Sequence, residues 1–150
     1  MASKAEILAA ARERARTNGI PYEGLLLPAE AAQLLREDSN AVLVDVRSRA
    51  EWDFVGRIPG AVEIEWKSYP GMTPNAQFQN QLESRVQKDA LVMFICRSGG
   101  RSHETALTAA KAGFKTCFNV LEGFEGDRDP SGHRNTVGGW RASGLPWTQS

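Results

Sequence analysis

A cysteine followed by arginines, serines and glycines is the part of this sequence best suited to chemistry. Cys96 opens the stretch Cys-Arg-Ser-Gly-Gly-Arg-Ser directly after the apolar run 91–95. The run predicts a buried strand and residues 102–113 predict a helix, so Cys96 should lie where a strand leads through a tight loop into a helix. Unpaired N–H groups at a helix N-terminus favour anions, a thiolate among them. With Arg97 and Arg101 beside it, Cys96 is expected to be a nucleophilic, partly ionised thiol.

The remaining residues of this loop are suited to binding an anion. The glycine pair allows backbone N–H groups to turn inward as a nest, and arginine binds oxyanions such as a sulfonate through its planar guanidinium. Alternatively, Arg101 forms a structural ion pair with Asp45 or another carboxylate, and Ser102 caps the helix. The predicted substrate-binding residues are Arg97, Ser98, Gly99, Gly100, Arg101 and Ser102.

Further motifs accompany the Cys96 loop in a characteristic order. They are Leu43-Val44-Asp45-Val46-Arg47, then Glu51-Trp52, then Gly56-Arg57-Ile58-Pro59-Gly60-Ala61 and, after the loop, Asn119-Val120-Leu121-Glu122-Gly123-Phe124. From about Tyr22 onward, this ordered set resembles the rhodanese-type sulfurtransferases. One departure is Arg57, where that family more often has histidine.

The resemblance implies a thiosulfate sulfurtransferase that uses Cys96 as its catalytic residue. The thiolate would take sulfur from thiosulfate or a persulfide donor, and a small thiol, cyanide or a protein thiol would accept it from the Cys96 persulfide. The resemblance implies neither a cofactor nor a metal. Asp45 and Arg47 generally support the wall of the active site in this family, so we predict them behind the loop as a salt-bridged pair.

Two other functions stay open. The first is a rhodanese-like sulfur carrier or regulatory module, whose partner would carry out the chemistry. The second is a cysteine-dependent phosphatase or arsenate reductase, because some dual-specificity phosphatases share a rhodanese-like fold. A C-x5-R phosphate loop would place arginine at position 102, which is serine here. Arg101 closes a loop one residue shorter, which favours sulfur over phosphate.

A second nucleophile and a histidine also invite a catalytic interpretation. His103 follows the loop, but neighbouring residues in a helix point about 100° apart, so its ring does not easily reach Cys96. Cys117 lies within a predicted strand and is expected in the core. It would act as a resolving thiol only if it lay near Cys96.

Two more features have structural and functional alternatives. Trp66 and Phe124 either line the pocket or pack locally beside loops. Residues 127–132 imitate the first half of a calcium loop, but the twelfth position, which should be glutamate, is Gly138. We interpret this segment as a turn and predict no metal site.

Apolar residues recur at intervals that predict alternating strands and helices. Strands are predicted at 22–27, 41–46, 61–64, 91–95 and 116–121, and helices at 28–36, 48–55, 78–86 and 102–113. Such alternation gives a parallel sheet covered by helices on both faces, with ligands bound off the carboxyl ends of the strands. Together with the resemblance it predicts an α/β, rhodanese-like three-layer fold with about five parallel strands.

Three segments lie outside this alternation. A capping box at 3–6 begins an amphipathic helix that Asn18-Gly19 ends. The segment 65–75 is irregular, the tail over 123–139 is polar and glycine-rich, and residues 140–143 can form a helical turn. The irregular segment and the tail are candidate surfaces for a protein partner.

Length and composition fit one domain. A chain of 150 residues can bury a full core, so we expect a peripheral helix over 1–20 and a single rhodanese-like domain over 21–150. Basic and acidic residues number 18 each, which gives no indication of a nucleic-acid or membrane partner. With no long apolar run and only two cysteines, a cytoplasmic protein with reduced thiols is expected.

Overall fold

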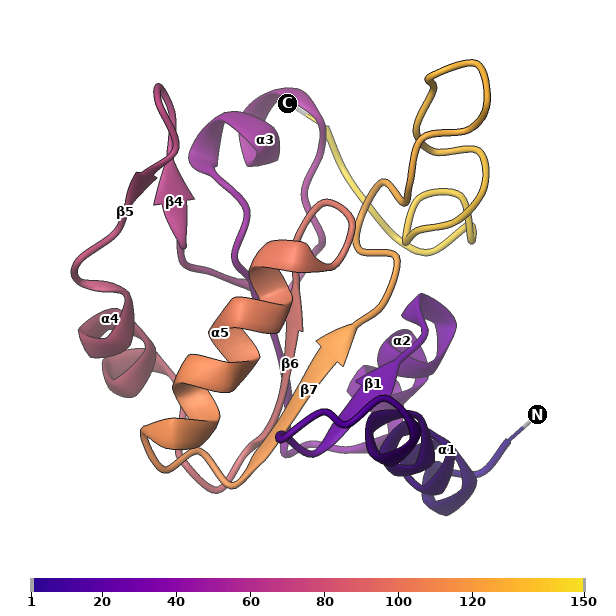
Figure 1. The fold of residues 1–150 in the computed structure, drawn as a ribbon, viewed down its shortest axis with the longest axis vertical. Coiled ribbons are helices and arrows are strands. Elements are labelled where there is room, and N and C mark those ends of the chain that lie inside the picture. Colours follow the sequence, from indigo (N-terminus) through magenta and orange to yellow (C-terminus); the bar gives the residue numbers. More distant parts are fainter. Residues whose placement is uncertain (1, 150) are drawn as a thin grey trace.

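Five short, largely apolar segments form one parallel sheet. In the computed structural model, which describes residues 2–149, the strands are β1 (Gly24–Leu26), β2 (Ala41–Asp45), β3 (Val62–Glu63), β6 (Leu91–Ile95) and β7 (Thr116–Val120). Their order across the sheet is β1-β7-β6-β2-β3, and every neighbouring pair is parallel. The strand that leads to Cys96 is therefore in the centre of the sheet (Figure 1).

Helices cover both faces of this sheet, which confirms the predicted α/β fold. They are α1 (Lys4–Thr17), α2 (Pro28–Glu37), α3 (Arg49–Phe54), α4 (Phe78–Arg85) and α5 (Gly100–Lys111). Alternate residues of a strand point to opposite faces, so Val92 and Phe94 of β6 pack with α4 and α5, while Met93 and Ile95 pack with α1 and α2. None of the helices within residues 2–149 has the length and apolarity needed to cross a membrane.

The N-terminal helix lies against the edge of the sheet. Ile7 and Ala11 of α1 are buried in the core that α2 also contacts, and Ala15 belongs to the core on the other face. The helix approaches β1 so closely that a Cβ atom at Gly24 would lie 3.0 Å from the Ala11 backbone. The predicted division between this helix and the domain, at residue 20, stays a prediction.

The helix after Cys96 begins two residues earlier than predicted. Gly99 adopts a φ of +116° at the N-cap, so the helix starts at Gly100. Glycine is suited to this left-handed conformation because it has no Cβ atom. Ser102 therefore lies inside the first turn, and the alternative that it caps the helix is wrong. The irregular segment 65–75 contains a small antiparallel hairpin, β4 (Lys67–Ser68) with β5 (Thr73–Pro74).

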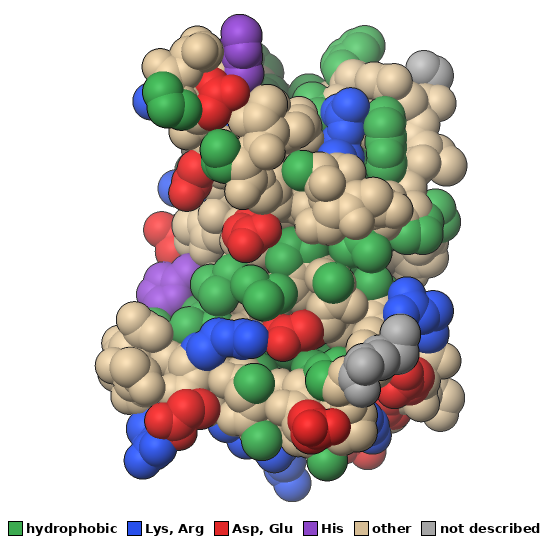
Figure 2. Space-filling view, turned by 90° about the vertical axis from the view of Figure 1, so that its right-hand side faces the viewer, with side chains coloured by type: hydrophobic (Ala, Val, Ile, Leu, Met, Phe, Trp, Pro, Cys, Tyr) green, Lys and Arg blue, Asp and Glu red, His purple; other side chains and the backbone are tan. Residues whose placement is uncertain are grey.

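The C-terminal tail folds back over the carboxyl ends of the strands. Thr148 pairs with Arg57 through two backbone hydrogen bonds of 2.9 Å, and Trp140 is buried with its indole N–H on the Pro146 carbonyl oxygen. The loop before α5, helix α3 and the tail gather in the upper part of Figure 1. On the face shown in Figure 2, acidic and basic side chains are interspersed and no extended patch has one sign.

Candidate active site

Cys96 follows the last residue of β6, and its thiol is enclosed by the loop that comes next. The residue is 1% exposed. The Gly99 N–H donates to Sγ at 3.1 Å, and the Ser102 Oγ lies 3.3 Å from Sγ. The positive φ of Gly99 is what allows its N–H to face back toward the sulfur. The sulfur atom therefore lies beside an N–H donor at the N-terminus of α5.

The predicted binding residues surround this thiol at different depths. Ser102 is fully buried, Ser98 and Gly99 are half-buried, and Arg97 and Gly100 are exposed. Within residues 2–149, no carboxylate forms an ion pair with Arg97. Its cationic group therefore remains free to meet an anion that approaches the loop.

Arg101 forms an ion pair with Glu51, which begins the short helix α3. Nη1 and Nη2 of Arg101 lie 2.7 and 3.0 Å from the two Glu51 carboxylate oxygens. The alternative pairing of Arg101 with Asp45 is wrong, and the pairing with another carboxylate is confirmed. The guanidinium is thereby fixed as a positive charge beside the loop. Its direct contact with a substrate stays a prediction.

Burial and pairing have opposite effects on the ionisation of this pair. Burial disfavours the Glu51 charge, but hydrogen bonds and charge from Arg101, with help from Ser48, outweigh it and lower the Glu51 pKa. Burial likewise disfavours the Arg101 charge, and Glu51 outweighs it and raises the Arg101 pKa. The Ser48 N–H and hydroxyl both donate to Glu51 Oε1, at 3.1 and 2.9 Å. The carboxylate that positions Arg101 is thus itself held in place.

Replacing Glu51 with glutamine should remove an acid-sensitive part of the stability. A carboxyl whose pKa is lowered by folding stabilises the protein above its unfolded pKa, ordinarily 4.5, and this stability is lost as the pH falls through the folded pKa. We expect the E51Q variant to lose about 1–3 kcal/mol near neutral pH, and less as the pH falls below about 4.5. Urea unfolding at several pH values measures this difference.

An exposed ion pair provides the control for this measurement. Glu13 pairs with Arg16 on the surface of α1, with side-chain exposures of 58% and 78%. The E13Q variant should therefore differ from the wild type by less than about 1 kcal/mol at any pH. If E51Q and E13Q behaved alike, Glu51 would have no special role in stability.

Asp45 and Arg47 form a fully buried ion pair behind the loop. Arg47 Nη2 lies 2.7 Å from Asp45 Oδ2 and donates to the Gly56 carbonyl oxygen at 2.8 Å. The guanidinium carbon is 4.1 Å from the centre of the Phe124 ring. The predicted salt-bridged pair is present, and its contact with Phe124 connects it to the segment that follows β7.

The segment after β7 packs directly on the peptide that contains Cys96. The Phe124 N–H donates to the Cys96 carbonyl oxygen at 2.8 Å, and the Glu125 N–H donates to the Arg97 carbonyl oxygen at 2.9 Å. Gly123, with a φ of +64°, lies so close that a Cβ atom there would be 2.5 Å from the Arg97 carbonyl carbon. Residues from the ends of β6 and β7 therefore form one connected structure around the thiol.

A family model for the rhodanese-like domain matches residues 27–128, which is more than half of the chain. The chain belongs to the rhodanese-like family. Among curated proteins, an uncharacterised protein of Rickettsia prowazekii is 35% identical over 120 residues, covering 79% of this chain and 91% of that protein. The chloroplastic rhodanese-like domain-containing protein 14 of Arabidopsis thaliana is 27% identical over 95 residues, covering 49% of this chain and 42% of that protein.

Solved structures show the same rhodanese-like architecture. The crystal structure of Rv0390 from M. tuberculosis has a TM-score of 0.79 and 43% identity, and the match covers 86% of this chain and 99% of that one. A polysulfide-sulfur transferase homodimer from Wolinella succinogenes has a TM-score of 0.59 and 22% identity, with 95% and 85% covered. The second likeness concerns the fold alone.

The second cysteine and the histidine lie away from the thiol of this rhodanese-like site. Cys117 pairs in register with Val92, four residues before Cys96, which places it about 13 Å away along the strands. Burial raises the Cys117 pKa to about 12, so it is an unreactive core thiol. The His103 Nδ1 is 2.7 Å from the Tyr22 hydroxyl, so that nitrogen is engaged away from the sulfur. The core assignment of Cys117 is confirmed.

The two aromatic side chains and the acidic turn have structural contacts. Trp66 packs edge-on against Phe78 and donates its indole N–H to Glu104, while Phe124 lies between Arg47 and the tail. Asp129 accepts hydrogen bonds from its neighbouring turn residues. Local packing therefore accounts for both aromatic residues, and the acidic segment forms the predicted turn.

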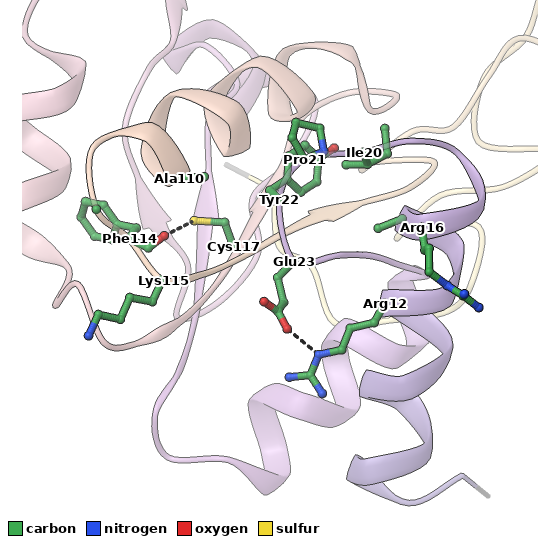
Figure 3. A pocket seen from close by; sticks show the side chains of 12 residues that line it. Arg12, Arg16, Ile20, Pro21, Tyr22, Glu23, Ala110, Phe114, Lys115 and Cys117 are labelled. Atoms are coloured by element: carbon green, nitrogen blue, oxygen red, sulfur yellow. Dashed lines mark hydrogen bonds and ion pairs between the residues drawn. The ribbon is translucent and has the colours of Figure 1, made fainter.

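A cavity lies apart from Cys96, between the C-terminal ends of α1 and α5. It has a volume of about 670 Å³, and Tyr22, Phe114 and Cys117 contribute to its lining (Figure 3). Arg12 pairs with Glu23 across its rim. Arg12 is thus paired and burial raises the pKa of the Cys117 thiol, so the geometry around Cys96 identifies the candidate active site better than this cavity does.

Three residues that contribute to the site were not predicted as site residues. Glu51 and Gly123 were recognised only as parts of the motifs that carry the family resemblance. The third is Asn119. Its Oδ1 accepts a hydrogen bond from the Ser102 hydroxyl at 2.6 Å, and its Nδ2 donates to the Gly99 carbonyl oxygen at 3.2 Å. A single amide within the otherwise apolar end of β7 was the sequence signal that could have identified it.

Proposed function

We propose that this rhodanese-like protein transfers sulfane sulfur through a persulfide on Cys96. The observation that carries the proposal is the buried Sγ atom at the end of the central strand, which accepts the Gly99 N–H at 3.1 Å. Family membership supports it, and a protein of the same fold is named a polysulfide-sulfur transferase. A free cysteine that served only to fill the core would need neither this loop nor the exposed Arg97 beside it.

In the first half-reaction, the Cys96 thiolate attacks the sulfane sulfur of thiosulfate or of a persulfide donor. The bond from Sγ to that sulfur forms while the sulfur–sulfur bond of thiosulfate breaks, and sulfite leaves with the electron pair. The outer persulfide sulfur then carries the negative charge. In this proposal, loop N–H groups and the exposed Arg97 stabilise the charge on donor and product.

In the second half-reaction, cyanide or a thiolate attacks the outer sulfur of the persulfide. The acceptor forms a bond to that sulfur, and the electron pair of the broken bond returns to Sγ as the thiolate. The cycle needs no oxidant or reductant, because sulfur moves between nucleophiles at each step. One covalent intermediate shared by two half-reactions predicts ping-pong kinetics.

Intact-mass measurement before and after addition of thiosulfate tests this proposal. The reduced wild-type protein should gain the mass of one sulfur atom. The C117A variant, which removes the other buried thiol, should gain it too, whereas C96A should not. Sulfur uptake by C96A, or no uptake by a folded wild-type protein, would contradict the proposal.

Adding a sulfur acceptor distinguishes a sulfurtransferase from a sulfur carrier. Cyanide should remove the sulfur from the wild type and release thiocyanate over repeated cycles. A stable persulfide that only a partner protein can discharge would identify a sulfur carrier instead. Phosphatase chemistry is less favoured because both terminal nitrogens of Arg101 face Glu51, and hydrolysis of p-nitrophenyl phosphate tests it directly.

A further inference from the structure

The Ser102 hydroxyl has one proton and two neighbours that can accept it. Its Oγ lies 2.6 Å from Asn119 Oδ1 and 3.3 Å from Cys96 Sγ. Ser102 is 0% exposed, Asn119 4% and Cys96 1%, so bulk water does not provide a second donor. The Tyr22 hydroxyl, which also lies beside the Asn119 amide, is engaged with His103 Nδ1 at 2.7 Å. A hydroxyl donates to one acceptor at a time. The direction of this proton therefore determines which of the two acceptors the Ser102 hydroxyl serves.

The catalytic loop fixes the orientation of the Asn119 amide. Its Nδ2 donates to the Gly99 carbonyl oxygen at 3.2 Å. Turning the amide over would place Oδ1 against that carbonyl oxygen and leave two acceptors without a donor. Oδ1 therefore faces Ser102, and the short hydrogen bond directs the Ser102 proton to Asn119. Ser102 then presents a lone pair to the sulfur, and a protonated Cys96 can donate its S–H to that lone pair.

Ionisation of Cys96 creates a competitor for the same proton. A thiolate has no proton to donate to Ser102 and is stabilised by donors such as the Gly99 N–H. If the Ser102 hydroxyl turned toward the thiolate, the buried Oδ1 of Asn119 would lose this donor, which is unfavourable. The amide and the thiolate thus compete for one hydroxyl group.

We propose that Asn119 is a positioning residue that acts through the Ser102 hydroxyl to restrain ionisation of the Cys96 thiol. The restraint keeps more of the resting protein in the thiol form and leaves the remaining thiolate more basic and hence more nucleophilic. This use of the thiolate rests on the proposed function. Once Sγ has bonded to sulfur it is a weak acceptor, so Asn119 keeps the Ser102 proton without competition.

The pH dependence of Cys96 alkylation by iodoacetamide tests this inference. All variants are made in the C117A background, so that only the Cys96 thiol can be alkylated. The N119L variant, whose side chain has a similar size and no acceptor, should move the midpoint of the alkylation rate to lower pH by about 0.7 unit, a roughly fivefold change in ionisation. The limiting rate at high pH should fall about twofold, because a less basic thiolate is less nucleophilic.

The S102A background distinguishes an effect through the hydroxyl from a general loosening of the loop. Without the hydroxyl, adding N119L should leave the midpoint unchanged. An unchanged midpoint in N119L alone, or an equal shift in the S102A background, would overturn the inference. If N119L lacks the native circular dichroism spectrum, N119V, which suits a strand, replaces it. Alkylation needs no sulfur donor, so this test is independent of whether the persulfide forms.

Discussion

Replacing Gly123 with alanine should destabilise the protein and slow persulfide formation together. The new Cβ atom would lie 2.5–2.6 Å from backbone atoms of Cys96 and Arg97, at a φ of +64° that disfavours a side chain. Overpacking and left-handed strain together give an expected loss of about 2–5 kcal/mol. Because the clash is with the peptide that carries Cys96, the proposed nucleophile, persulfide formation should slow about tenfold to a hundredfold.

Gly132 offers a matched control for this prediction. It has a φ of +82°, and a Cβ atom there would meet nothing within 4 Å. The G132A variant should therefore show the conformational cost alone, about 1–2 kcal/mol, with an unchanged rate of persulfide formation. Urea unfolding and time-resolved intact mass measure the two effects. Equal losses in G123A and G132A would show that contact with the Cys96 loop is unimportant.

Replacing Arg47 with methionine should cost about 3–5 kcal/mol of stability, because it leaves Asp45 buried without its ion partner. The Gly56 carbonyl oxygen would lose a donor, and the Phe124 ring would lose the cation above it. Thermal and urea unfolding of R47M measure the loss. The partly exposed pair of Arg57 with Glu63 supplies the control, since R57M should cost about 1 kcal/mol or less.

A double variant identifies the source of the Arg47 effect. D45N removes the carboxylate charge and retains an acceptor for the Arg47 N–H, which donates to Asp45 at 3.1 Å. The D45N/R47M protein should therefore be at least about 2 kcal/mol more stable than R47M. If the double variant were no more stable than R47M, lost packing rather than an unpaired charge would explain the defect.

The sequence predicted those parts of the site that depend on neighbouring residues. An apolar run, a cysteine and a glycine pair are contiguous, and alternation along the chain was sufficient to place Cys96 at the carboxyl edge of a parallel sheet. The buried pair of Asp45 and Arg47 lies only two residues apart, so it too could be anticipated. Local spacing and sheet topology were enough for these features.

Contacts between segments that lie far apart in the sequence could not be predicted from local spacing. Arg101 and Glu51 are 50 residues apart, and several exposed or buried carboxylates were equally available to Arg101 in the sequence. Only the order of strands decides that α3 lies beside the loop. Asn119 and Ser102 meet because β7 is next to β6, and the start of α5 depends on one glycine dihedral angle.

The strand order also determines when the site can assemble during synthesis on the ribosome. Cys96, which follows β6, is synthesised before β7. The strand pairs and loop contacts that enclose its sulfur require residues up to Phe124. At about 5–20 residues per second, the nascent thiol stays unenclosed for a few seconds. The backbone pairing of Arg57 with Thr148 needs residues still further along the chain, so it forms only after the contacts that enclose the thiol can be made.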